Sequence, residues 1–405
     1  MRGGLASAPM PHSLLDRLRD YPFDRLRGLL DGIAPPAGLP PLVLSVGEPR
    51  HAPPPMVARL LAENAADWGR YPPTEGTADF RAAVAGWLQR RYGLPDGLVD
   101  PDLHVLPVAG TREALFLIAQ VATGRRRLEG CPLVLMPNPF YQVYFGAAVF
   151  ARAEPVFLPA TRETGFLPDL AAIAPQTLRR TEMLYLCSPS NPQGAVADMA
   201  MLRRAIELAR AHDFILCVDE CYADIWDAAP PTGALAACAA LQDGLANVLV
   251  FHSLSKRSSV PGLRSGFVAG DARLIAGFRR LRAFGGAAVP LPVLAASAAL
   301  WRDDAHAATN RDLYRAKLDL AERILGSRFE FRRPAGGFFL WLDVGDGEQA
   351  ARALWSEAAL RVLPGAYLAR NSADGDNPGA RYVRIALIDD LPSTEDALRR
   401  LRKIL

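Results

Sequence analysis

Cysteine is scarce in this sequence and follows no recognisable pattern. Among the 405 residues the five cysteines are Cys131, Cys187, Cys217, Cys221 and Cys238. Their number is odd, and their spacing fits neither a disulfide framework nor a zinc site. Cys217 and Cys221 come closest to a metal pair, but Cys217 lies in the apolar run Phe214–Val218, which is typical of a buried strand. We therefore expect reduced thiols, no metal and a cytoplasmic location.

An excess of charge of one sign is also missing, as is any apolar segment that suits a membrane. The 46 basic residues nearly balance the 43 acidic ones, so charge gives no reason to expect nucleic acid or an anionic membrane as a partner. Residues 1–20 contain no apolar block as long as that of a signal peptide. Pro132–Ala151 is uncharged, but Pro137, Asn138 and Pro139 in its middle do not suit a membrane helix. We expect a soluble protein.

The rest of the composition is that of a globular protein, with 50% hydrophobic and 22% charged residues. From Val43 onward, short apolar runs alternate with amphipathic helical patterns such as Arg112–Thr123 and Asp198–Ala211. The predicted strands are Leu103–Val108, Leu133–Met136, Pro155–Leu158, Met183–Cys187, Phe214–Val218, Val248–Phe251 and Phe267–Ala269. This alternation predicts an α/β fold with a mainly parallel sheet and helices on both faces.

The chain is too long for one compact core, so we expect two domains. After about residue 290 the pattern becomes that of a smaller α+β domain. Its predicted strands are Gly337–Val344, Arg361–Leu363 and Tyr382–Leu387, its helices Gln349–Ala359 and Thr394–Lys403, and its surface loop Asn371–Ala380. We assign residues 1–46 to a segment that joins the small domain, 47–290 to the large domain and 291–405 to the small one.

Ligands of parallel sheets bind beyond the carboxyl ends of the strands, so the loops there are expected to carry the chemistry. The loop after Phe251 holds Lys256 between serines and cations. A neighbouring cation disfavours the ammonium form, which leaves a nucleophilic amine able to form a Schiff base. The hydroxyl of Ser253 and the guanidinium of Arg264 suit a phosphate group. A basic surface loop is the alternative interpretation.

Two other strand ends place polar side chains at the same edge. Asp219 ends a buried strand, where a carboxylate needs a cationic partner such as a protonated pyridine, although helix caps are common at such positions. Tyr222, three residues further on, suits a ring hydroxyl. Asn191 precedes a proline that holds it away from helical geometry, and its amide also suits a phenolic oxygen, with a plain turn as the alternative.

The remaining loops offer a phosphate cup and an aromatic ring. After Val108 the chain opens directly into a helix at Thr111 and Arg112, where free N–H groups favour phosphate, and Gly110 allows close approach of the backbone. Tyr141 offers a ring to stack on a planar cofactor, with a core aromatic as the alternative. Together these loops supply a lysine, a phosphate cup, a stacking ring, a carboxylate for a pyridinium and two donors to a phenolate.

At these residues the sequence resembles the class I and II aminotransferases, pyridoxal-phosphate enzymes of fold type I. The matching segments are Ser45–Pro49, Tyr71–Gly76, Ala109–Leu115, Ser188–Gly194, Val218–Tyr222, Ser253–Arg264 and Tyr382–Leu387. They occur in order over nearly the whole chain. The resemblance implies the fold, the cofactor pyridoxal 5'-phosphate and the transfer of amino groups between amino acids and 2-oxo acids.

The resemblance also implies a role for each residue of the site. Lys256 would carry the cofactor and move the substrate proton, Asp219 would pair with the pyridine nitrogen, and Tyr222 would hold the phenolic oxygen together with Asn191. The phosphate contacts would come from Gly110, Thr111, Arg112, Ser253 and Arg264, with Tyr141 stacked on the ring. Arg384 would bind the substrate carboxylate beside Gly47 and Asn191. Tyr71 would reach the phosphate of a neighbouring subunit, which implies a homodimer with shared active sites.

A narrower set of segments resembles the N-succinyldiaminopimelate aminotransferases of lysine biosynthesis. These segments are Tyr21–Leu30, Ser45–Pro54, Asn138–Tyr144, His252–Asp271 and Asn377–Ile388. They imply N-succinyl-L,L-diaminopimelate as amino donor and 2-oxoglutarate as acceptor. The alternatives are another class I aminotransferase, with a succinylornithine-, acetylornithine- or aspartate-like substrate, and a carbon–sulfur β-lyase of the same fold. A donor with two carboxyl-bearing ends needs a second anion contact, for which Arg50, Arg112 and Arg381 are candidates.

Overall fold

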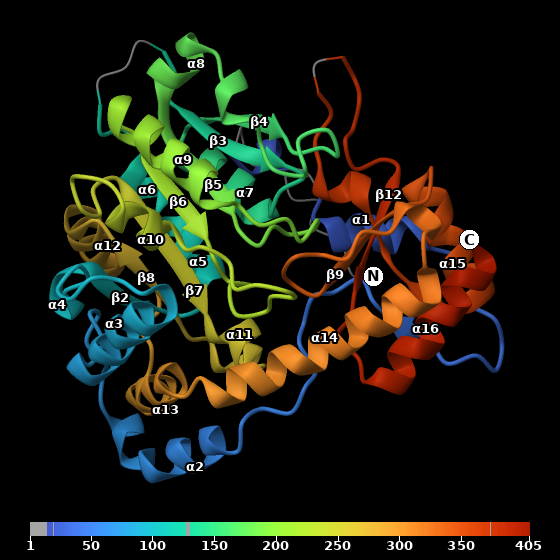
Figure 1. Cartoon of the computed structure of the whole chain (residues 1–405), viewed down its shortest axis with the longest axis horizontal. Helices are drawn as coiled ribbons and strands as arrows, with labels where there is room; N and C mark the ends of the chain where they lie inside the picture. The colour runs from blue at the N-terminus through green and yellow to red at the C-terminus, as the bar shows by residue number, and fades with distance from the viewer. Residues whose placement is uncertain (1–13, 19, 127–129, 373) are drawn as a thin grey trace, which may run out of the picture.

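The computed structural model describes residues 14–18, 20–126, 130–372 and 374–405. Residues 1–13 of the predicted N-terminal segment, together with residues 19, 127–129 and 373, lie outside this description. Figure 1 shows a larger body built around a central sheet and a smaller body beside it, with the long helix α14 (Ala305–Leu325) running from one to the other. No described helix is both long and apolar enough to cross a membrane.

A seven-stranded sheet in the order β2-β8-β7-β6-β5-β3-β4 forms the centre of the larger body. Its strands are β2 (Val105–Val108), β3 (Leu133–Asn138), β4 (Glu154–Pro159), β5 (Thr181–Cys187), β6 (Ile215–Asp219), β7 (Val248–Ser253) and β8 (Gly266–Gly270). β8 is antiparallel to both of its neighbours, whereas the other pairs are parallel. The prediction of a mainly parallel sheet is confirmed. The carboxyl ends of β2, β3, β5, β6 and β7 share one edge, at which β8 begins.

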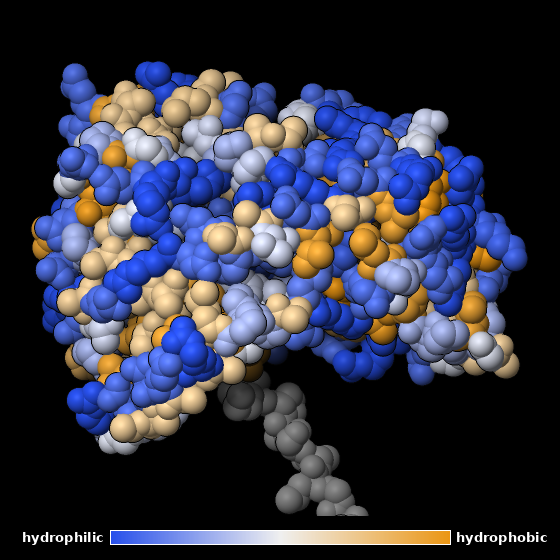
Figure 2. All heavy atoms as spheres, turned by 60° about the horizontal axis from the view of Figure 1, so that its bottom comes forward, coloured by the Kyte–Doolittle hydropathy of each residue, from blue (hydrophilic) through white to orange (hydrophobic). Residues whose placement is uncertain are grey.

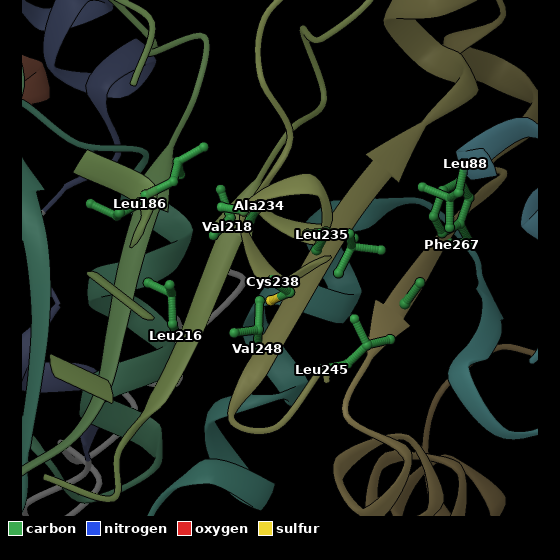
Figure 3. Packing of buried hydrophobic residues seen from close by; sticks show 14 of the residues in the cluster. Leu88, Leu186, Leu216, Val218, Ala234, Leu235, Cys238, Leu245, Val248 and Phe267 are labelled. Atoms are coloured by element: carbon green, nitrogen blue, oxygen red, sulfur yellow. The ribbon is translucent and has the colours of Figure 1, made fainter. Parts of the chain in front are cut away.

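Helices cover both faces of this sheet, as predicted. On one face, side chains of α3, α9, α10 and α13 pack in one hydrophobic cluster, and on the other face α5, α6, α7 and α12 pack in a second. Figure 3 shows the first cluster, where Leu216 and Val218 of β6 and Val248 of β7 meet Leu235 and Cys238 of α10. The helices of this body are α2 (Met56–Glu63), α3 (Ala78–Tyr92), α4 (Pro101–His104), α5 (Thr111–Leu117), α6 (Ala119–Ala122), α7 (Gln142–Phe150), α8 (Pro175–Arg180), α9 (Met199–Ala211), α10 (Ala234–Ala239), α11 (Leu254–Arg257), α12 (Ala272–Phe284) and α13 (Leu291–Arg302).

The smaller body contains two short sheets. β11 (Leu363–Pro364), β12 (Tyr382–Ala386) and β9 (Phe339–Asp343) form an antiparallel sheet, and β1 (Leu42–Val43) pairs in parallel with β10 (Leu360–Arg361). The helices here are α1 (Pro22–Leu29), α14, α15 (Gly347–Ala358) and α16 (Leu391–Ile404). Leu26 and Leu29 of α1 belong to the hydrophobic core of this body. The N-terminal part of the chain thus packs with its C-terminal part.

Short 3-10 helices connect the longer elements. They are η1 (Leu14–Arg17), η2 (Ala65–Gly69), η3 (Leu170–Ala172), η4 (Pro261–Leu263), η5 (Arg328–Glu330) and η6 (Gly365–Leu368).

Three predicted elements differ from the structure. Leu103 belongs to α4 rather than to a strand, because the carboxylate of Asp100 accepts hydrogen bonds from the backbone N–H groups at the start of this helix. The helix predicted over Arg112–Thr123 is interrupted at Ile118, which ends α5 and precedes α6. The strand predicted over Arg361–Leu363 is divided between β10 and β11, which belong to different sheets.

Candidate functional site

A cavity of about 450 Å³ lies at the carboxyl edge of the large sheet, between the two bodies. Most of the residues singled out in the sequence line it: Gly47, Thr111, Arg112, Tyr141, Asn191, Asp219, Tyr222, Ser253, Lys256, Arg264 and Arg384. Gly110 lies beside the cavity against Arg264. Tyr71, by contrast, is fully exposed and does not line it. The wall also includes Tyr21 and Phe23 of the N-terminal segment, for which no role was predicted.

Lys256 lies in α11, directly after β7. The side chain of Ser253 caps this helix by accepting a hydrogen bond from the N–H of Ser255 at 3.1 Å. The Lys256 amine donates to the carbonyl oxygen of Gly47. Burial lowers the pKa of Lys256 to about 8, and the charge of Arg384 acts in the same direction. About a tenth of the amine is therefore neutral, and nucleophilic, at pH 7.

Asp219 ends β6 with its carboxylate buried. The hydroxyl of Tyr144 donates to this carboxylate at 2.7 Å, and the backbone N–H of Cys221 donates at 3.2 Å. The ring of Tyr144 stacks on Tyr185, with centroids 4.4 Å apart. Burial raises the pKa of Asp219, and the hydrogen bonds oppose that rise. This carboxylate would be stabilised by a cation in the cavity.

Tyr144 was missed by the sequence analysis, although it follows Tyr141 by three positions. Both belong to the start of α7, Tyr141 as its N-cap, and their rings meet edge to face at 5.7 Å. The three-residue spacing on a helix is the signal from which a second tyrosine facing the site could have been predicted.

Arg384 lies in the middle of β12 and is 4% exposed. It donates to the side-chain oxygen of Asn191 at 3.0 Å and to the carbonyl oxygen of Ser45 at 2.6 Å. Its guanidinium carbon lies 4.3 Å from the ring centroid of Phe339. Burial lowers the pKa of Arg384 to about 10, so it stays charged at neutral pH. Its Nε has no partner among the described residues, which leaves a donor for a carboxylate.

Gly47 faces the same part of the cavity. A Cβ at this position would lie 2.5 Å from the ring of Phe339, so only glycine lets the loop pass this close to the ring.

Arg264 precedes β8, and its side chain reaches the loop that follows β2. It donates to the carbonyl oxygens of Pro261 at 2.8 Å and Ala109 at 3.2 Å. Gly110, with φ of +85°, lies against this guanidinium, and a Cβ there would overlap it. The guanidinium, Ser253 and the first N–H groups of α5 thus come together, as expected of an anion site.

Arg112 joins the N-terminal segment to the site. It donates to the hydroxyl of Tyr141 at 3.0 Å and to that of Tyr21 at 2.6 Å. Among the three candidates for a second anion contact, Arg112 lines the cavity. Arg50 pairs with Asp389, and Arg381 pairs with Asp343 at 3.0 Å, both away from it.

Comparison with known proteins identifies the family of the chain. The family model described as aminotransferase class I and II matches residues 40–388. The chain is 36% identical to the 4-dedimethylamino-4-oxo-anhydrotetracycline transaminase OxyQ of Streptomyces rimosus, over 91% of this chain and 95% of that protein. It is 31% identical to the LL-diaminopimelate aminotransferase of Syntrophobacter fumaroxidans, over 94% and 95% of the two chains.

Solved structures agree with these relatives. An aminotransferase from Neisseria meningitidis superposes with a TM-score of 0.91 at 40% identity, over 96% of this chain and 99% of that one. A probable N-succinyldiaminopimelate aminotransferase from Thermus thermophilus superposes with a TM-score of 0.81 at 26% identity, over 97% and 100% of the chains. The predicted fold type is thereby confirmed.

The effect of Gly110 on the position of Arg264 can be tested by comparing alanine substitutions at Gly110 and at Gly124. Both have positive φ, but the space around Gly124 is open. Gly110→Ala and Gly124→Ala should each cost about 1–2 kcal/mol of stability from the left-handed backbone. Only Gly110→Ala should also displace Arg264 and abolish the rise in Tm that inorganic phosphate causes in protein stripped of small molecules. An unchanged phosphate response in that variant would contradict the assignment of Arg264 to an anion site.

Proposed function

This chain belongs to the class I and II aminotransferases, and we propose that it transfers the amino group of N-succinyl-L,L-diaminopimelate to 2-oxoglutarate. The family uses pyridoxal 5'-phosphate and acts on amino acids and 2-oxo acids. The observation that carries the proposal is that two arginines, Arg384 and Arg112, line a single cavity that also holds Lys256.

The residues at the cavity fit pyridoxal phosphate. Asp219 is a buried carboxylate whose pKa is raised by burial, and a protonated pyridine nitrogen would relieve that cost. Arg264 and the N–H groups at Thr111 would hold the phosphate, while Asn191 and Tyr222 would face the phenolic oxygen. When bound, the cofactor supplies an electron-withdrawing ring that stabilises negative charge at the substrate α-carbon.

The chain's own groups then bind the substrate and move its proton. Arg384 would bind the α-carboxylate through two parallel N–H donors and so orient the α-carbon toward Lys256. The Lys256 amine, with its pKa lowered to about 8, would accept the α-proton at neutral pH and return it. Gly47 lines the same cavity as both groups, and its carbonyl oxygen accepts a hydrogen bond from Lys256.

The proposed substrate follows from the second arginine. A diaminopimelate derivative has carboxyl groups at both ends, and Arg112 supplies a cation for the distal one without leaving the cavity. A carboxylate would be a stronger hydrogen-bond partner for Arg112 than the two tyrosine hydroxyls that it contacts. Two of the similar proteins reported above are named for diaminopimelate substrates, which supports this class of donor.

The lowered pKa of Lys256 predicts how the cofactor-free protein captures pyridoxal phosphate. The neutral amine is the reactive form, so the capture rate should rise roughly tenfold per pH unit below 8 and level off above it. Stopped-flow absorbance between pH 6.5 and 9.5 measures this. Butylamine, a control with an ordinary amine, should show no plateau below pH 9.5. If the capture rate of the protein still rose at pH 9.5, this result would contradict the lowered pKa of Lys256.

A half-reaction screen tests the substrate. Wild-type protein is mixed with succinyl-diaminopimelate, LL-diaminopimelate, succinylornithine, glutamate, aspartate and cystathionine, and the cofactor absorbance is followed. Succinyl-diaminopimelate and glutamate should react fastest. Release of pyruvate and ammonia from cystathionine would instead identify a β-lyase.

Arginine variants locate the two carboxylate contacts. Arg384→Ala should weaken every donor by about 2–5 kcal/mol, because each has an α-carboxylate. Arg112→Ala should weaken donors with a distal carboxylate but leave alanine unaffected. Arg381→Ala is the control, since its side chain is exposed and paired with Asp343, and should change neither. Equal effects of Arg112→Ala on alanine and on dicarboxylic donors would overturn the assignment.

The homodimer with shared sites is part of the same proposal. Trp68, Tyr71 and Phe284 are large side chains that are 55%, 101% and 88% exposed. Figure 2 shows a face that is mostly hydrophilic, with hydrophobic residues gathered in patches. An exposed tyrosine in the segment Tyr71–Gly76 is what a contact to the neighbouring subunit's phosphate requires.

A hybrid dimer tests this arrangement. Lys256→Ala and Tyr71→Ala proteins should each be inactive or weak alone. When the two are co-expressed, each mixed dimer should contain one site with both residues intact, and activity should return to about half the wild-type value per mixed dimer. Mixing two different Lys256 variants is the control. No recovery in purified mixed dimers would place Tyr71 outside the shared site.

A further inference from the structure

One face of α14 carries three polar side chains beneath the cavity. Asn310, Tyr314 and Lys317 are spaced by four and three positions, so they lie along the same side of the helix. Asn310 is 7%, Tyr314 1% and Lys317 1% exposed. Of these, the sequence analysis and the proposed mechanism use none.

A continuous chain of hydrogen bonds runs through Lys317, His51 and Asn310. Lys317 Nζ lies 2.7 Å from His51 Nε2, and His51 Nδ1 lies 2.7 Å from the side-chain oxygen of Asn310. The amide nitrogen of Asn310 donates to the carbonyl oxygens of Lys256 at 2.9 Å and Arg257 at 3.1 Å. The directions agree: a neutral His51 accepts from the lysine and donates to the amide oxygen. Burial lowers the pKa of His51, which favours this neutral form.

The same residues join three segments that carry the site. Asn310 holds the main chain of α11 around Lys256. His51 belongs to the loop of Gly47, and its carbonyl oxygen accepts a hydrogen bond from Ser259 at 2.8 Å. Lys317 also donates to the carbonyl oxygen of Leu387 at 3.1 Å, just beyond the strand of Arg384. Figure 1 shows α14 passing from α11 toward the smaller body, so the helix links both sides of the cavity.

An aromatic column runs parallel to the hydrogen bonds. The rings of His51 and Tyr314 have centroids 4.5 Å apart, and Tyr314 stacks on Phe338 at 4.9 Å. The Lys256 amine lies 5.4 Å from the centroid of Phe338. The packed rings therefore lie against the Lys256 amine, and the hydrogen bonds hold the main chain of α11 that carries it.

The use of lysine at position 317 is itself informative. The chain has three lysines, Lys256, Lys317 and Lys403, among 46 basic residues, the rest being arginine. An ammonium is compact and carries three rotatable donors, so it can donate to an imidazole nitrogen and to a carbonyl oxygen at once. The guanidinium that this chain otherwise prefers is larger and holds its donors in a fixed plane.

We propose that His51, Asn310 and Lys317 are positioning residues that hold the Lys256 turn in register with the Gly47 loop and the Arg384 strand. They touch neither substrate nor cofactor and act through the main chain of α11. The inference rests on the assignment of Lys256 as the cofactor lysine, and not on the identity of the amino donor.

The test compares two substitutions of similar size at position 51. His51→Gln keeps one donor and one acceptor, whereas His51→Leu keeps the bulk and removes both. His51→Leu should lower kcat with glutamate and the rate of pyridoxal phosphate capture by cofactor-free protein about tenfold or more, with KM within about twofold. His51→Gln should recover most of both. Thr309→Ala, on the exposed side of α14, is the control and should match wild type.

The outcomes distinguish a positioning role of these residues from a role that only fills space. Equal behaviour of His51→Leu and His51→Gln would show that the residue only fills space, and the network would be rejected. If His51→Leu fails to fold by its thermal transition, Lys317→Met replaces it, and wild-type kcat and capture rate in that variant would overturn the proposal. Failure of the proposed donor to react in the wild-type protein leaves the capture measurement intact, so the two proposals fail separately.

Discussion

The parallel register of β5, β6 and β7 sets Cys187, Asp219 and Phe251 level with one another at one edge of the sheet. These strands are buried on both faces, and alternate residues pack against α10 and against α5. A slip of one residue would exchange the two sets and unpack both cores. The position of Asp219 relative to the turn of Lys256 is therefore determined by the packing of the sheet. The packing of the core thus also determines how the loops at this edge are aligned.

Local pattern was enough to predict the strands and the loops that carry the chemistry. Apolar runs bounded by Gly, Pro and polar residues mark β3, β5, β6 and β7, and the parallel rule then places their loops on one edge. What the pattern did not supply are contacts between distant segments. The hydrogen bond from Tyr144 to Asp219 and that from Arg112 to Tyr21 join residues far apart in the chain, and no periodicity encodes them. The break at Ile118 and the division of Arg361–Leu363 were missed for the same reason, since tertiary packing overrode local propensity.

The cavity concentrates positive charge: Arg384 is buried and Lys256 half-buried, whereas Arg264 and Arg112 are exposed. Lys256, Arg264, Arg112 and Arg384 all line it, and the pKa values of Lys256 and Arg384 are lowered chiefly by burial. Backbone carbonyl oxygens of Gly47, Ser45 and Ala109 accept hydrogen bonds from these cations. Such dipoles offset part of the cost of burial but leave the net charge unbalanced. Anionic ligands would complete this balance, and the phosphate and two carboxylates of the proposed function meet that requirement.

The site takes residues from both bodies, so the two bodies must be held at a defined distance from each other. Arg384 belongs to the smaller body and Lys256 to the larger one, so the two groups proposed to act on one substrate are built on separate cores. Their separation cannot be determined by the packing of either core alone. A helix of 21 residues such as α14 is about 30 Å long and resists bending, and it contacts elements on both sides. The loop from Ser45 to His51 adds a second link, because Ser45 accepts from Arg384 and Gly47 from Lys256. The distance between the Arg384 guanidinium and the Lys256 amine is thus maintained by segments that have no part in the proposed chemistry.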